Sequence, residues 1–318
     1  MASDSHKNVD ERHDPLDSLG YIIDYTSPGI LVNNTICCSI TVLVTILTIS
    51  LNSVTVLAYW KSTQLRRNMT NFLILILSLN DLAVGLFVGP LYVLLLAREI
   101  TLNRATVVIN YLNLGSLLLF TGISFETMIV MNCERYLGIV HPILHKTKVT
   151  KERLLQCLLA VWFVGGAQAL LLFYYTDSFV KLKTAEVIFC MILLVYMYVK
   201  IYLTAKQSRN IGSRPKNCRV RIHHEEAPHF KHKSLLQNLK LAKSCFLVVI
   251  SSYVCFLPAC IIAGVIDSRN EVAYMVQTWS ETLLLLNSSL NSVLFFWRNN
   301  CLRKEALILI GYTFVNNM

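Results

Sequence analysis

The sequence predicts an all-α membrane protein: a seven-transmembrane helix bundle followed by a short amphipathic eighth helix. Hydrophobic residues make up 54% of the 318 residues and charged residues only 15%. Together with a mean hydropathy of +0.52, this exceeds what an ordinary soluble domain carries. Seven apolar runs each approach the length at which a helix crosses a bilayer.

The seven runs define the expected transmembrane segments. Basic residues follow the first, third, fifth and seventh runs, whereas the alternate loops mix both signs. The positive-inside rule then places the amino terminus outside and the carboxyl terminus inside a multi-pass plasma membrane protein. The runs lie at about 35–60, 71–97, 104–135, 154–175, 185–205, 238–266 and 273–297.

Three parts of the chain follow from these runs. Residues 1–30 are polar and acid-leaning, and they read as a disordered extracellular tail rather than a cleaved signal peptide. Residues 31–298 form the seven-transmembrane domain, and 299–318 an amphipathic helix on the inner leaflet with a short cytoplasmic tail. A sequon begins at Asn33, close to the first run, and marks a glycosylation candidate.

Several kinds of function are disfavoured. The net charge of +10 is concentrated in short loops, which favours a bilayer partner over nucleic acid. The ten cysteines lie mostly inside apolar runs, with no pair in the outer segments, so no disulfide framework is indicated. The histidines match no standard zinc pattern. We expect no enzymatic activity and no organic cofactor.

Polar residues within the apolar runs require partners, because hydrocarbon penalises an unpaired polar group. Asp81 is the sharpest case, in the second run. A carboxylate near hydroxyl and amide oxygens can bind a small hard cation such as sodium. The alternative is that these polar side chains only hydrogen-bond to one another between helices, which we call the polar-glue interpretation. Both interpretations stay open. The candidate group is Asp81, Ser124, Asn287, Ser288 and Asn291.

Seven motifs, in order and at suitable spacing, resemble those of rhodopsin-like (class A) G protein-coupled receptors over residues 35–305. A Glu-Arg-Tyr triplet ends the third run, and a Cys-Phe-x-Pro segment lies in the sixth. The motifs are Leu51-Asn52-Ser53-Val54, Leu79-Asn80-Asp81-Leu82, Glu134-Arg135-Tyr136, Trp162, Tyr198, Cys255-Phe256-Leu257-Pro258 and Asn287-Ser288-Ser289-Leu290-Asn291-Ser292-Val293-Leu294-Phe295.

The chain also departs from the family pattern. The usual cysteines at the outer end of the third helix and in the short loop after the fourth helix are both absent, and that combination most resembles the melanocortin, lipid and adenosine-like group of this family. Ser292 and Cys190 stand where prolines are expected, so helices seven and five should lose their kinks. Phe256 replaces the usual tryptophan and Phe295 the usual tyrosine.

The resemblance implies a mechanism. Ligand binding favours an arrangement in which the sixth helix swings outward about Pro258, releasing Arg135 for a heterotrimeric G protein. Coupling is then assigned to Glu134, Arg135 and Tyr136, and the activation switch to Tyr198, Phe256, Pro258, Asn291 and Phe295. Residues 236–240 offer no second acid to hold the closed form, so we expect appreciable basal activity.

The ligand is extracellular and unidentified: a peptide, a lipid or a nucleoside-like molecule. Glu281 could meet a cationic group on it, or it could pair with Arg98 or face water. The third helix offers no aspartate for a biogenic amine, and Leu285 replaces the lysine a retinal receptor needs. We interpret Glu126 as a structural residue that hydrogen-bonds to a neighbouring helix. The ligand-binding candidates are Tyr92, Leu117, Leu118, Thr121, Cys260, Gln277 and Glu281.

Three functional readings remain. The first is a receptor that activates heterotrimeric G proteins, which the intact Glu134-Arg135-Tyr136 favours. The second is a seven-helix scaffold or partner subunit without signalling, which Phe256, Ser292 and Phe295 motivate. The third is a transporter or channel, which the lack of internal repeats disfavours.

Overall fold

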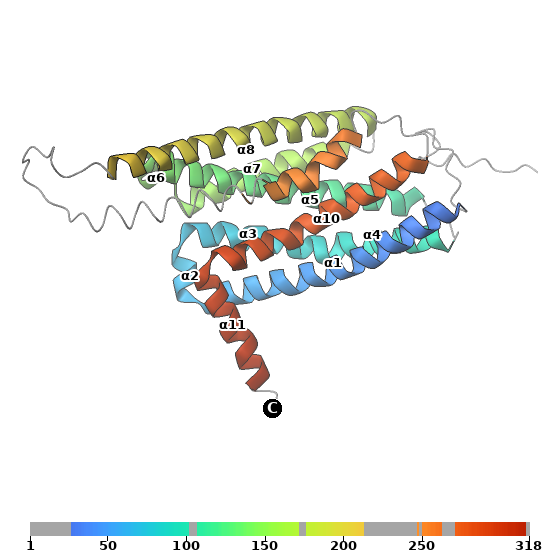
Figure 1. The fold of residues 1–318 in the computed structure, drawn as a ribbon, viewed down its shortest axis with the longest axis horizontal. Coiled ribbons are helices and arrows are strands. Elements are labelled where there is room, and N and C mark those ends of the chain that lie inside the picture. Colours follow the sequence, from blue (N-terminus) through green and yellow to red (C-terminus); the bar gives the residue numbers. More distant parts are fainter. Residues whose placement is uncertain are drawn as a thin grey trace, which may run out of the picture.

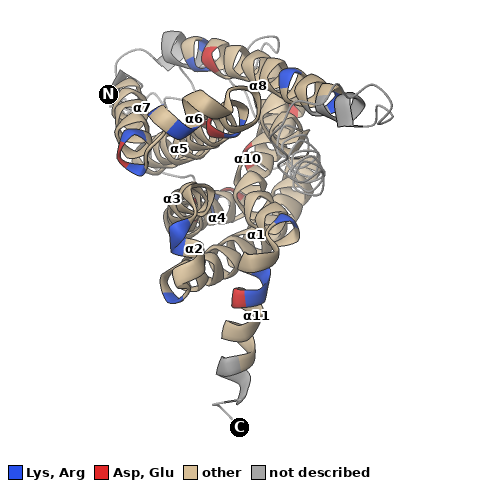
Figure 2. Ribbon diagram, turned by 90° about the vertical axis from the view of Figure 1, so that its left-hand side faces the viewer, with Lys and Arg blue, Asp and Glu red and all other residues tan. Residues whose placement is uncertain are grey.

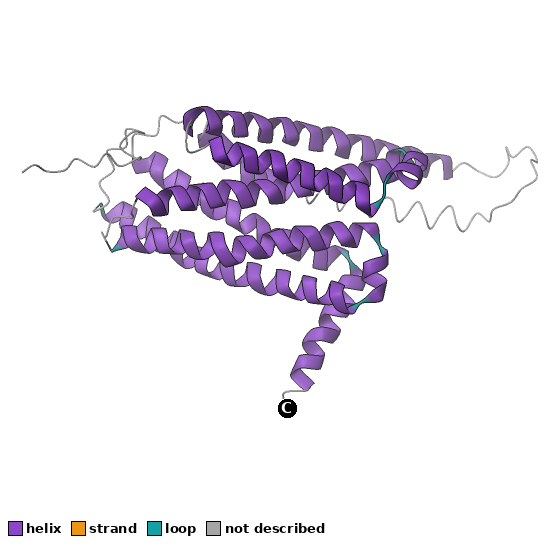
Figure 3. Cartoon of the chain, turned by 180° about the vertical axis from the view of Figure 1, so that it is seen from behind, coloured by secondary structure: helices purple, strands orange, loops and turns teal. Residues whose placement is uncertain are grey.

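The computed structural model describes residues 27–101, 107–171, 176–212, 247, 250–262 and 271–315. Within these ranges all regular structure is helical (Figures 1 and 3). The amino-terminal tail before residue 27 and the third inner loop lie outside the described residues. The helices are α1 (Pro28–Lys61), α2 (Thr63–Arg67), α3 (Met69–Ala83), the π-helical turn η1 (Val84–Val88), α4 (Gly89–Ile100), α5 (Val107–Val140), α6 (Pro142–Lys148), α7 (Lys151–Leu171), α8 (Thr176–Gly212), the helix Ile250–Ile262, α10 (Glu271–Arg298) and α11 (Asn300–Val315).

The predicted seven-helix bundle is confirmed. Each expected run overlaps a helical segment among the described residues, the sixth at Ile250–Ile262, and α3, η1 and α4 together make the second. Among the described residues, four segments are long and apolar enough to cross a bilayer by length and composition alone: Pro28–Lys61, Met69–Ile100, Val108–Val140 and Lys181–Thr204. Segment α10 carries more polar residues, because it supplies much of the polar core described below.

The long helices lie side by side along the long axis of the molecule, and α11 leaves the bundle at an angle (Figure 1). Lysines and arginines mark the end of the bundle that carries α2, α6 and the start of α7 (Figure 2). We call this the basic end. Its basic residues include Lys61, Arg66, Arg67, Lys146, Lys148, Lys151, Arg153 and Arg298.

Two helices differ from their expected bounds in an informative way. Helix α1 begins at Pro28, a favourable first-turn residue because its missing N–H would be unpaired there anyway. Helix α8 begins at Thr176, so the stretch 177–186, expected to be an outer loop, is helical. Helices α8 and α10 run uninterrupted, as expected for chains that lack the family's prolines in these segments.

Close packing of α1 against η1 depends on Gly85. A Cβ at this position would lie 2.8 Å from Ile49 Cγ1, which is closer than carbon atoms approach. Glycine therefore lets the two helices approach near the level of Asp81.

Candidate functional site

The Asp81 carboxylate is fully buried at the centre of the bundle. The Ser124 hydroxyl on α5 donates to Asp81 Oδ1 at 2.6 Å, and the Asn291 amide on α10 donates to Oδ2 at 3.2 Å. Each carboxylate oxygen thus accepts a bond from a different helix. Three helices therefore meet at this acid. The two hydrogen bonds avoid the free-energy cost of an unpaired acid in hydrocarbon.

A second layer of amides supports this contact. Asn80 Nδ2 donates to Ser124 Oγ at 2.5 Å and to the Phe120 carbonyl at 3.0 Å. On α1, Asn52 Nδ2 donates to the Thr48 carbonyl at 2.9 Å, and Asn52 Oδ1 accepts from Ser292 Oγ at 2.6 Å. The polar core therefore joins α1, α3, α5 and α10.

The oxygen donors of this core fit a small hard cation. Of the predicted metal group, the structure brings Asp81, Ser124 and Asn291 into direct contact. The Oδ1 atoms of Asn287 and Asn291 are buried without a hydrogen-bond partner among the described residues. Carboxylate, hydroxyl and amide oxygens are ligands that hard cations prefer. The same contacts also satisfy Asp81 without an ion, which is the polar-glue interpretation.

The Glu134 carboxylate at the basic end contacts two basic side chains. Arg135 Nε lies 3.3 Å from Glu134 Oε2, and His145 Nε2 lies 2.9 Å from Glu134 Oε1. The Glu134 side chain is 4% exposed, against 16% for Arg135 and 27% for His145. Sequence reasoning identified the Glu-Arg pair and missed His145, which lies eleven residues along the chain on α6.

The predicted switch residues divide into two clusters. The Phe256 ring is buried and packs on Phe125, with ring centroids 4.5 Å apart. Phe295 is buried in the same main core. Tyr198 instead packs on a smaller cluster with Ile139. Pro258 lies within the helix Ile250–Ile262.

The predicted ligand residues are partly gathered between α5 and α10. Gln277 Nε2 donates to Glu281 Oε1 at 3.2 Å, and Asn113 on α5 also hydrogen-bonds to Glu281. The Tyr92 hydroxyl donates to the Thr278 carbonyl at 2.9 Å and is buried. Leu117, Thr121 and Cys260 are buried and Leu118 is half-buried. Asn113 is the residue that sequence reasoning did not assign to this group.

A separate polar cluster ties α1, α4 and α10 at the end opposite the basic end. Asn34 Nδ2 donates to Glu99 Oε2 at 3.2 Å and to the Tyr274 hydroxyl at 2.9 Å. Asn33 lies within α1, is 9% exposed, and accepts a bond from Trp279 Nε1 at 3.0 Å. The Asn33 side-chain amide nitrogen, where a glycan would be attached, donates to Asn34 Oδ1 at 3.2 Å, and glycosylation at Asn33 stays a prediction from the sequence.

Glu126 is bonded to a neighbouring helix, as expected from the sequence. Its Oε1 lies 3.2 Å from Lys183 Nζ on α8, and the same ammonium lies 3.2 Å from Glu186 Oε2. Lys183 is 14% exposed and Glu126 is 9% exposed. A charge cluster therefore joins α5 to α8 within the apolar part of the bundle.

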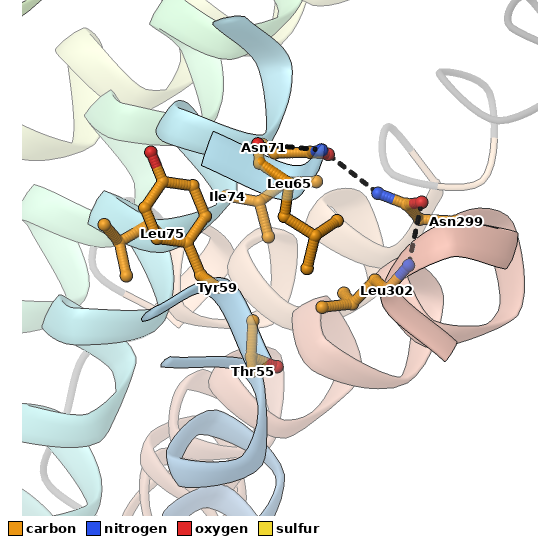
Figure 4. Close-up of a pocket in the computed structure, with 8 residues that line it drawn as sticks. All are labelled: Thr55, Tyr59, Leu65, Asn71, Ile74, Leu75, Asn299 and Leu302. Carbon is orange, nitrogen blue, oxygen red and sulfur yellow. Dashed lines mark hydrogen bonds between the residues drawn. The ribbon is translucent and has the colours of Figure 1, made fainter. Parts of the chain in front are cut away.

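Helix α11 is anchored to the bundle around a cavity of about 10 Å³, room for about one water molecule. Asn299 Nδ2 donates to Asn71 Oδ1 at 2.8 Å (Figure 4). Nearby on α11, burial raises the pKa of the Cys301 thiol, and the Glu305 carboxylate raises it further. The cavity is lined by Thr55, Tyr59, Leu65, Asn71, Ile74, Leu75, Asn299 and Leu302.

Comparison with known proteins agrees with this architecture. Residues 51–194 match the family described as the 7 transmembrane receptor (rhodopsin family). With its helical bundle and ordered motifs, the chain is similar to the rhodopsin-like G protein-coupled receptors, a family of membrane receptors.

Among its relatives is lysophosphatidic acid receptor 3. The rat protein is 26% identical over 251 residues, which cover 71% of this chain and 67% of the relative. The mouse protein matches to the same extent. The human protein is 23% identical over 245 residues, covering 69% of this chain and 64% of the relative. These relatives agree with the expected placement near the melanocortin, lipid and adenosine-like group.

Proposed function

We propose that this receptor converts ligand binding at the end opposite the basic end into activation of a heterotrimeric G protein at the basic end. The basic end then faces the cytoplasm, as the positive-inside rule requires. The observation that carries the proposal is the Glu134–Arg135 pair at the rim of the bundle, with a buried acid and a partly exposed base. Such a base can be released to a partner without unfolding the helix.

The test is agonist-free signalling in cells carrying a panel of G protein reporters. Arg135→Ala should abolish reporter activity at matched surface expression. Arg67→Ala removes an exposed arginine from α2 at the same end and should leave activity unchanged. Activity that survives Arg135→Ala would support the alternative, a seven-helix scaffold acting through another route.

The ligand's chemistry is proposed from the group around Glu281. The Glu281 carboxylate accepts hydrogen bonds from Gln277 and Asn113, and Asn113 Oδ1 is buried without a partner among the described residues, so it can accept a further one. Such a site favours a donor that carries positive charge. We assign it a peptide, lipid or nucleoside-like ligand with an amine or guanidinium group.

The relatives are named for lysophosphatidic acid, and an acidic head group would be repelled by Glu281. Screening paired pools that differ only in carrying an amine or a phosphate tests this assignment. An active amine-bearing compound should lose potency by about tenfold or more with Glu281→Gln, since a charge-assisted bond is replaced by a neutral one. Activation by the phosphate-bearing members alone would refute the assignment.

The polar core is proposed to hold a sodium ion beside Asp81. Support comes from the Asp81, Ser124 and Asn291 contacts and from the unpaired amide oxygens of Asn287 and Asn291. Bound sodium would supply positive charge to a buried carboxylate and so stabilise the arrangement in which α3, α5 and α10 are in contact.

A further inference from the structure

The charges of the cluster that joins α5 to α8 do not balance. The Lys183 ammonium lies 3.2 Å from Glu126 Oε1 and 3.2 Å from Glu186 Oε2, so one base pairs with two acids. The Glu186 carboxyl also lies within hydrogen-bond reach of Glu126, but two ionised carboxylates have no proton to donate to each other. The three side chains together carry one net negative charge, which is costly in the apolar part of a membrane bundle.

The oxygen atoms around this charge have room for a further donor. Glu126 is 8% exposed, and its Oε2 is buried without a hydrogen-bond partner among the described residues. This atom approaches α7 at Gly165, where an added Cβ would lie 3.3 Å from it. Within the same part of the chain, Glu186 Oε2 makes its ion pair without an aligned hydrogen bond, and Gln168 Oε1, one turn along α7 from Gly165, is buried and unpaired. The oxygens therefore suit a donor that carries positive charge.

The cluster opens toward the outer surface of the bundle. Helices α7 and α8 both pack along α5 on one side of the molecule and barely contact each other (Figure 1). Glu186 is 31% exposed, and Leu182 and Phe189, one turn before and one turn after it on α8, are exposed. Val164, next to Gly165 on α7, is exposed as well. An apolar chain can lie against these side chains while a polar group at its end reaches the acids.

We propose that the site between α5, α7 and α8 binds an amphiphile of the bilayer that carries a protonated primary amine at the end of a single alkyl chain. The ammonium supplies the missing positive charge and up to three N–H donors for the unpaired oxygens. The alkyl chain stays in the hydrocarbon beside α8.

The charge of the cluster selects this occupant over other amphiphiles. An anionic head group would add to the net negative charge, and a neutral alcohol would leave it uncompensated. The site is separate from the ligand group around Glu281, which lies between α5 and α10. The proposal therefore does not depend on G protein coupling or on the ligand assigned to Glu281.

The test uses the full-length receptor in phosphatidylcholine nanodiscs. The probe is hexadecylamine with a photoreactive diazirine on its chain, and crosslinked residues are mapped by mass spectrometry. The probe should label α7 and α8, and excess hexadecylamine should suppress this labelling. Hexadecanol and hexadecyl phosphate have the same chain and should not suppress it. Equal suppression by hexadecanol would mean that the surface binds alkyl chains alone, and it would overturn the proposal.

Variants place the binding at the acids. Glu126→Gln makes the cluster neutral and should weaken the amine-suppressed labelling about tenfold, since a charge-assisted hydrogen bond becomes a neutral one. Gly165→Ala changes no charge, but it puts a methyl group against Glu126 Oε2 and should weaken labelling too. Gly166→Ala is the matched control, because its Cβ would meet no described atom within 4 Å, and it should label like wild type.

Glu281→Gln should also label like wild type. Wild-type labelling in both Glu126→Gln and Gly165→Ala would show that the amine does not reach the acids, and the proposal would be wrong. Loss of labelling in Glu281→Gln alone would assign the amine to the ligand group on α10, which also overturns the proposal while supporting the ligand proposed there.

A thermal measurement gives a second readout. Lys183→Met removes the ammonium of the cluster, so added hexadecylamine should raise the melting temperature of this variant more than that of wild type, because a ligand that binds the folded state stabilises it. Hexadecanol should raise neither. An equal response of the two receptors to hexadecylamine would mean that the amine acts through the bilayer, and a proton shared by Glu126 and Glu186 would then be the occupant.

Discussion

The Ser292 hydroxyl donates a 2.6 Å hydrogen bond to Asn52 Oδ1, and so joins α10 to α1 where the family usually has a proline. Both side chains are fully buried. Ser292→Ala would leave the Asn52 amide oxygen unsatisfied, at a cost of about 1–3 kcal/mol. We expect a lower melting temperature for the purified receptor. Ser50→Ala, which removes an exposed hydroxyl bonded only to its own helix, is the matched control and should melt like wild type.

Restoring the family proline should be worse than removing the hydroxyl. Helix α10 is continuous through residue 292, so Ser292→Pro removes a backbone bond as well as the contact to Asn52. The backbone effect alone costs about 3 kcal/mol. The expected result is low surface expression and a melting temperature below that of Ser292→Ala. A Ser292→Pro receptor that melts like wild type would mean that α10 can accept a kink here at little cost.

Among the described residues, the order of the long membrane segments followed from the sequence, because long apolar runs have few alternatives in a bilayer. The start of α8 did not follow. The charges of Lys183 and Glu186 are typical of a loop, but the Lys183 ammonium pairs with both Glu186 and Glu126, and the helix continues through these residues. A hydropathy scale treats each charged residue in isolation. The free-energy cost of burying that residue in a membrane, however, depends on whether a partner elsewhere in the chain pairs with it.

The sequence likewise predicted only part of the candidate site. Asp81, Ser124 and Asn291 were grouped by motif, and they do lie in contact. His145 was missed because its contact with Glu134 depends on the turn between α5 and α6. The residue spacing of a single helix does not predict a contact across such a turn. Asn113 was missed for a related reason: its bond to Glu281 joins α5 to α10 across the bundle.

Sodium should stabilise the receptor through Asp81. The purified wild type is expected to melt several degrees higher in sodium chloride than in potassium chloride at equal ionic strength, because ligands that bind the folded state raise its melting temperature. Asp81→Asn should lose the difference between the two salts. An equal response to both salts in wild type would indicate that the polar core acts as interhelical hydrogen bonding alone.

The pair formed by Glu126 and Lys183 should behave as a coupled unit. Both side chains are mostly buried, so Lys183→Met leaves the Glu126 carboxylate uncompensated, at a cost of about 3–5 kcal/mol, whereas Glu126→Gln leaves Lys183 still paired with Glu186. Lys183→Met should therefore lower the melting temperature of the purified receptor strongly and Glu126→Gln less, and the double variant should recover most of the loss caused by Lys183→Met, since replacing both charges is often close to neutral. Glu186→Gln, which removes the more exposed acid of the cluster at 31%, should cost less than Lys183→Met, because Lys183 keeps its contact with Glu126. If the double variant loses the sum of the two single losses in melting temperature, the two residues stabilise α5 and α8 independently. The ion pair would then not position α8.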